Sequence, residues 1–143
     1  GPLTNSVPNN KGFDFFYGYN CQRQAHNLYP THLWRNEKRH ILDNYIIDKN
    51  LNGNDPYLEK TYKKFNQKDY APTLMHNEAL QFIEKNKNHP FFLYYASPLP
   101  HLPLQAPKNW VNYYKIKKSL NMKKKYYRKI KIAKTLKNQK NFH

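Results

Sequence analysis

His101 is the residue of this chain whose surroundings are best suited to chemistry. It follows an uncharged run at residues 91–96, and four prolines at positions 98, 100, 103 and 107 surround it. Prolines leave few backbone conformations open to their neighbours, so the imidazole is held stiffly. Such an imidazole can donate a hydrogen bond or a proton to a group that gains negative charge. The other interpretation is that His101 only bonds a backbone carbonyl in a proline-rich loop.

A second polar group precedes it in the chain. Gln22, Arg23 and His26 follow the aromatic block at residues 12–19 and precede a second aromatic group at residues 29–34. Polar side chains between aromatic anchors often line a pocket. The alternative is a surface loop whose side chains are solvated. His32 and His40 are expected to face solvent.

The elements that must position His101 are a helix and a strand. Residues 70–86 predict a helix, because Pro72 suits a first turn and apolar side chains recur at three- and four-residue spacing. Met75 and Phe82 are expected in the core. The unbroken apolar run at 91–96 predicts a strand buried on both faces, as in a parallel α/β sheet. Ligands bind at the carboxyl ends of such strands.

The remaining segments are expected to be peripheral. Two glycines bound the aromatic block at 12–19, which predicts a short buried turn beneath a site. Residues 36–68 are poor in apolar periodicity, and Asn52-Gly53 predicts the turn of a hairpin there. Residues 108–114 predict a short amphipathic turn.

The positive charge is concentrated at the carboxyl end. The 143 residues, one domain's worth at most, have a net charge of +16, and twelve of the 25 basic residues but none of the nine acids lie at 115–143. We expect a domain at 1–114 and a Lys-rich tail at 115–143 that is disordered or a frame-shifted reading of adenine- and thymine-rich DNA. A basic-tailed nucleic-acid binder is the alternative. Lysine runs are more often simply solvated, so no specific nucleic-acid partner is expected.

Two classes of feature are excluded by composition. No run approaches the roughly 20 apolar residues of a membrane span. The single Cys21 rules out an internal disulfide and a multi-cysteine zinc site.

Three blocks together resemble one enzyme family. Residues 12–34, 70–83 and 90–107 are similar to the middle of arylsulfatases, the bacterial members of the formylglycine-dependent sulfatase family, and the P-H-x-P-L-Q segment at 100–105 is the most specific part. The resemblance implies an alkaline-phosphatase-like α/β fold, here an incomplete sandwich with a mostly parallel sheet. It also implies hydrolysis of a sulfate ester, either a small molecule or a sulfated glycan, with formylglycine and calcium. Such enzymes are usually exported, so a periplasmic or secreted location is expected.

The resemblance also suggests roles for individual residues. His101 stands where the family places a catalytic histidine that contacts the sulfate. Gln22 falls near a polar substrate contact of some sulfatases, with Arg23 and His26 close by. The nucleophile motif C/S-x-P-S/A-R is absent, since Gln22, Arg23 and Gln24 follow Cys21. No metal ligand is assigned here, because the paired acidic residues expected to bind calcium are missing.

These departures predict an internal fragment that does not hydrolyse sulfate esters alone. A further possibility is a remnant whose exposed apolar sheet edges make it aggregate or require a partner.

Overall fold

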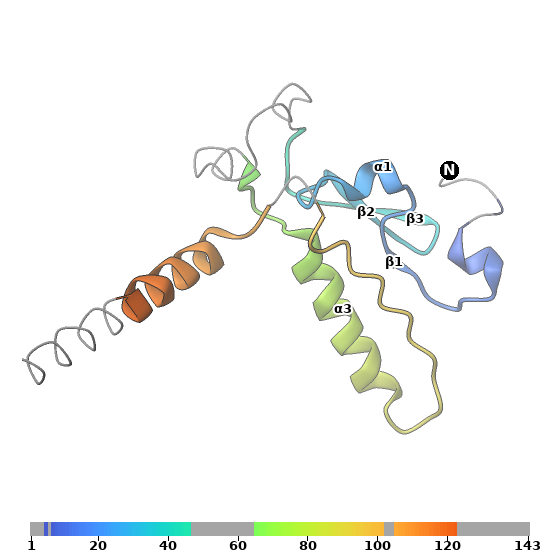
Figure 1. Cartoon of the computed structure of the whole chain (residues 1–143). Helices are drawn as coiled ribbons and strands as arrows, with labels where there is room; N and C mark the ends of the chain where they lie inside the picture. Colours follow the sequence, from blue (N-terminus) through green and yellow to red (C-terminus); the bar gives the residue numbers. More distant parts are fainter. Residues whose placement is uncertain (1–4, 6, 47–64, 102–104, 123–143) are drawn as a thin grey trace, which may run out of the picture. The chain divides into compact units, whose positions relative to one another are not determined.

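The computed structural model describes residues 5, 7–46, 65–101 and 105–122 (Figure 1). The chain divides into two compact units, Gly1–Ala106 and Pro107–His143, which are taken separately below. Among the described residues the first unit holds a three-stranded antiparallel sheet in the order β1-β2-β3. Its elements are the 3₁₀ helix η1 (Pro8–Lys11), β1 (Tyr17–Gly18), α1 (Gln22–Ala25), β2 (His32–Arg35), β3 (Lys38–Ile41) and α3 (Ala71–Asn86).

A tight hairpin joins β2 and β3. Arg35 pairs with Lys38, so the turn is the two residues Asn36 and Glu37. Asn36 has a φ of +52°, a conformation that asparagine tolerates better than most residues and that two-residue hairpins favour. Its backbone N–H donates to the Phe16 carbonyl and its Oδ1 accepts from the Phe16 N–H, both at 2.8 Å. The hairpin predicted around Asn52-Gly53 lies outside the described residues.

Helix α3 confirms the helix predicted from the spacing of apolar residues. It runs from Ala71 to Asn86, with Pro72 in its first turn. A core cluster of Leu33, Leu42 and Ala71 lies between the helix and the sheet, and Met75 packs against it as expected. Phe82 is only half-buried, and its ring stacks on that of Phe15 at a centroid distance of 6.2 Å.

An ion pair also ties the sheet to this helix. The Arg35 guanidinium donates to both carboxylate oxygens of Glu78 at 2.6 Å, and it lies 4.7 Å from the centroid of the Tyr17 ring. The hydrogen bonds that Arg35 donates to Glu78 raise the pKa of the guanidinium further above its ordinary value. Two parallel bonds fix the approach of the helix more tightly than a single contact would.

The prediction of a buried strand at residues 91–96 is wrong. Residues 90–98 are extended but pair with no described strand (Figure 1). The side chains at 91–95 are exposed. The described sheet is antiparallel, whereas the prediction was a mostly parallel one. The physical reason is that burial on both faces needs a layer packed against each face, and the described ring contacts with Phe13 and Phe82 leave these side chains exposed.

The second unit contains a helix over residues 108–122, longer than the short turn predicted for 108–114. The helix continues because the sequence from 108 to 122 contains no glycine or proline to end it. Within the described residues, no helix has the length and apolar character that crossing a membrane requires. The predicted disorder or frame shift at 115–143 stays a prediction, and residues 123–143 lie outside the described part.

Buried phenols make this fold sensitive to alkali. Tyr29 is 1% exposed, and burial raises the pKa of its phenol to about 12 from the ordinary 10.0. The folded chain therefore holds this proton to higher pH than the unfolded chain does. Stability is full below about pH 10 and is lost as the pH rises from there towards 12. Burial also raises the pKa of Tyr19 and of Tyr70 in the same direction.

We expect the raised pKa of Tyr29 alone to lower the free energy of unfolding by about 1 kcal/mol between pH 9 and pH 11. Urea unfolding at both pH values measures this loss. Tyr29→Phe has no phenol to ionise, so its loss over the same interval should be smaller by that amount. An equal loss in both proteins would contradict the assignment.

Candidate functional site

Two of the four predicted site residues meet in the structure. The imidazole rings of His26 and His101 stack with centroids 4.5 Å apart and planes 16° from parallel. His26 ends the short helix α1, and His101 lies in the proline-rich loop far along the chain. Both residues are exposed, so a ligand in solution can reach them. The fold therefore gathers two imidazoles from separate segments at one surface.

The loop of His101 is held to the body of the first unit by Gln105. This side chain is 5% exposed, and its Oε1 accepts a hydrogen bond of 2.6 Å from the Leu28 N–H. The Gln105 carbonyl accepts another of 3.0 Å from the Tyr70 hydroxyl. His101 itself closes a turn, since its N–H donates to the Pro98 carbonyl at 3.2 Å. Gln105 thus anchors the loop two residues from His26.

Sequence reasoning assigned no role to Gln105, although a signal for it was present. Gln105 is the last residue of the P-H-x-P-L-Q segment at 100–105, whose histidine was singled out. A polar side chain close to a candidate catalytic histidine can form a hydrogen bond with the backbone instead of with a ligand. The structure shows the backbone role, because the Gln105 amide oxygen bonds Leu28.

Hydrogen bonds to and from Asn27 fix the segment that carries His26. The Tyr19 hydroxyl donates to the Asn27 carbonyl at 2.8 Å. The aromatic block at 12–19 differs from the short buried turn that was expected, because it contains the strand β1 and only Gly18 within it is buried. The Asn27 side chain makes hydrogen bonds of 3.0 Å with both the N–H and the carbonyl of Tyr29. These bonds immobilise the chain on the carboxyl side of His26.

Helix α1 carries the other two predicted residues. Gln22 and Arg23 lie in this helix, and both are exposed. The helix is attached to β2 through Gln24, whose Nε2 donates to the His32 carbonyl at 2.7 Å. The structure therefore places Gln22 and Arg23 within one short helix that ends at His26. Their roles as substrate contacts stay predictions.

The histidines at 32 and 40 differ from the expectation that they simply face solvent. His32 is half-buried, and desolvation lowers the pKa of its imidazole. His40 is exposed, yet its Nδ1 lies 2.7 Å from the Tyr17 hydroxyl. Both belong to the β2–β3 hairpin. They serve the sheet and not the pair formed by His26 and His101.

The sequence resemblance implies two groups, calcium and formylglycine. In this part of the chain, no cluster of three or more His, Cys, Asp and Glu side chains could hold a metal ion. Cys21 is exposed, and backbone N–H groups of Gln24 and Arg23 lower the pKa of its thiol. The residues that follow it do not form the motif of a formylglycine precursor. No step is therefore derived through calcium or formylglycine.

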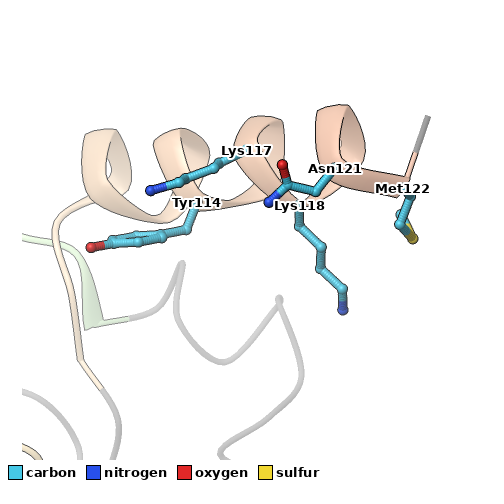
Figure 2. Close-up of a pocket in the computed structure, with 5 residues that line it drawn as sticks. All are labelled: Tyr114, Lys117, Lys118, Asn121 and Met122. Atoms are coloured by element: carbon cyan, nitrogen blue, oxygen red, sulfur yellow. The ribbon is translucent and has the colours of Figure 1, made fainter. Parts of the chain in front are cut away.

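A shallow depression on the second unit belongs to the basic helix at 108–122. Figure 2 shows its lining side chains, which all project from that one helix: Tyr114, Lys117, Lys118, Asn121 and Met122. The Lys117 ammonium lies 5.9 Å from the centroid of the Tyr113 ring. The ammonium groups of Lys117 and Lys118 can attract phosphate, but they provide no means of reading a base. The nucleic-acid alternative stays a hypothesis without a specific contact.

Comparison with known protein families gives a match over most of the chain. Residues 3–133 match the family model described as Sulfatase. This range contains the stacked histidines, the anchoring Gln105 and the described helix of the second unit. No curated protein matches the chain.

Proposed function

The chain belongs to the sulfatase family, and we therefore propose that His101, with His26 stacked on it, contacts the sulfate group of a sulfate ester. Family members hydrolyse sulfate esters and have an alkaline-phosphatase-like α/β fold. The described residues contribute a small antiparallel sheet and the helix α3 to it. More specifically, we propose an arylsulfatase-like site that binds aryl sulfates or sulfated glycans.

One observation carries the proposal. Two residues that sequence reasoning singled out separately lie with their rings 4.5 Å apart at an accessible surface. Each imidazole can donate hydrogen bonds from its ring nitrogens, and both nitrogens donate in the protonated form. Stacking involves the faces of the two rings, whereas the ring nitrogens lie at the ring edges. Sulfate oxygens are acceptors that such edges can bind.

The chemistry that these residues supply is binding and orientation. When a sulfate ester is cleaved, negative charge gathers on the sulfate oxygens and on the leaving oxygen. An N–H of His101 stabilises that charge and can pass a proton to the leaving oxygen. His26 limits rotation of the His101 ring through the stacking contact. Gln105 keeps the loop of His101 against the residues next to His26.

We propose that replacing His101 weakens binding of an aryl sulfate. His101→Ala should raise the dissociation constant for p-nitrophenyl sulfate about tenfold, the effect of losing a hydrogen bond to a charged group. Isothermal titration calorimetry with the full chain measures it. His76→Ala is the matched control, because His76 is an exposed histidine on α3. Equal affinities in the wild type and in both variants would exclude His101 as the sulfate contact.

We propose further that binding by this chain is not followed by turnover. The sequence lacks the motif of the family's nucleophile, and the described residues contain no cluster of three or more His, Cys, Asp and Glu side chains that could hold a metal ion. Release of p-nitrophenolate by the purified chain should therefore not exceed that by His101→Ala, measured by absorbance over several hours. Release that is faster in the wild type and saturates with substrate would overturn this proposal.

An exported location is proposed from the family alone.

A further inference from the structure

The stacking of His26 on His101 limits the positive charge that the two rings can carry together. Their centroids lie 4.5 Å apart, with the ring planes 16° from parallel. Two positive charges at such a distance repel each other even in water. A proton on one imidazole therefore opposes a proton on the other, and the pair binds its second proton less readily than its first.

The two segments that carry the pair add no carboxylate. Residues 15–36 and 85–143 contain no Asp or Glu. Arg23 precedes His26 by three positions in the single turn of α1, so a permanent positive charge lies on the same turn. Cys21 is the other titratable group there, and backbone N–H groups lower the pKa of its thiol.

The elements packed against these segments hold titratable groups that are neutral or already hydrogen-bonded. Burial raises the pKa of the Tyr19 and Tyr70 phenols, so both keep their protons at neutral pH. Desolvation lowers the pKa of His32 on β2, which favours its neutral form. The Asp69 carboxylate, next to Tyr70, accepts a hydrogen bond of 2.7 Å from the Asp43 N–H. An anion from solution can supply the charge that a second imidazolium needs.

A sulfate bound by the ring nitrogens supplies this charge. A protonated imidazole donates from both of its nitrogens, and hydrogen bonds from a charged donor to an anion are stronger than neutral ones. Sulfate therefore binds the protonated pair better than the neutral pair. By linkage, bound sulfate favours protonation of the pair to the same extent. Imidazoles change charge between pH 5 and pH 8, so this coupling acts near neutral pH.

We propose that the stacked pair binds sulfate together with protons. The protons come from the solvent and add to the imidazole nitrogens of His26 and His101 as the anion binds. Affinity is then highest at mildly acidic pH and is lost as the pH rises through the range in which imidazoles titrate. This inference rests on the proposed function of the pair as a sulfate contact, and it adds the control of that contact by pH.

Isothermal titration calorimetry of the full chain with inorganic sulfate tests the coupling, in buffers that differ in their enthalpy of ionisation. The dependence of the heat on the buffer gives the proton uptake, which we expect to be about one proton for each sulfate at pH 7. The dissociation constant should rise at least about tenfold from pH 6 to pH 8 at constant ionic strength. Sulfate itself stays a dianion throughout, so the protons bind to the protein.

Three variants locate the protons. His26→Gln keeps a hydrogen-bond donor but cannot be protonated, so it should take up fewer protons and show a weaker dependence of affinity on pH. Cys21→Ser removes the other titratable group of α1 and should behave as the wild type. His76→Ala, at an exposed position on α3, should do the same. Proton uptake that persists in His26→Gln but is lost in Cys21→Ser would contradict the proposal.

Nuclear magnetic resonance separates this inference from the proposed function. With saturating sulfate, the pH midpoints of the His26 and His101 imidazole signals should both move to higher pH, while that of His76 stays in place. If sulfate moves both signals but binds equally well at pH 6 and pH 8 without proton uptake, the sulfate contact stands and the coupling is wrong. Absence of sulfate binding at every pH in this range would overturn both.

Discussion

Leu33→Ala is expected to lower the free energy of unfolding by about 2 to 5 kcal/mol, the range for emptying a core leucine site. Leu33 is 0% exposed and belongs to the core cluster that joins the sheet to α3. The described core of the first unit is small, so little neighbouring material can relax into the cavity. Urea unfolding followed by circular dichroism measures the change, and the variant is expected to be largely unfolded at 37 °C.

Leu80→Ala is the matched control for this core substitution. Leu80 lies on α3 with half of its side chain exposed, so its truncation should cost less than about 1 kcal/mol. If Leu33→Ala and Leu80→Ala cost the same, the packing of β2 against α3 is not what holds the first unit together.

Gln105→Leu is expected to have the second largest effect and to act on the site as well. The substitution leaves the Leu28 N–H without its acceptor, which costs about 1 to 3 kcal/mol for a buried donor. The loop of His101 then loses its anchor beside His26. We expect the nuclear Overhauser effects between the two imidazoles to weaken and the affinity for p-nitrophenyl sulfate to fall with them.

Gln81→Leu serves as the control, since Gln81 is an exposed residue of α3. It should change the free energy of unfolding by no more than about 0.5 kcal/mol and leave the imidazole contact intact. A Gln105→Leu protein that keeps both its stability and the contact between His26 and His101 would contradict the anchoring role.

The sequence predicted those features whose causes are local. Helix α3 follows from apolar spacing and from Pro72 at its start, both of which act within one element. The candidate role of His101 came from the prolines around it and from the family resemblance. The structure adds that His26 lies against its ring.

Features that depend on distant partners could not be predicted in the same way. The apolar run at 91–96 predicts a buried strand, but burial of both faces requires packed layers that the described residues do not provide. The tight turn at Asn36 is stabilised by Phe16, a contact that no local pattern reveals. The bond from Leu28 to Gln105 also joins segments that are far apart in sequence.

The most direct test of the proposed site is a titration of the full chain with inorganic sulfate, followed by the imidazole ¹H–¹³C signals in nuclear magnetic resonance spectra. We predict that the signals of His26 and His101 move together and saturate, while those of the exposed His76 and His89 stay in place. Chloride at the same ionic strength should not reproduce the shifts. Uniform small shifts of all histidines, or shifts that spare His101, would contradict a sulfate contact by the stacked pair.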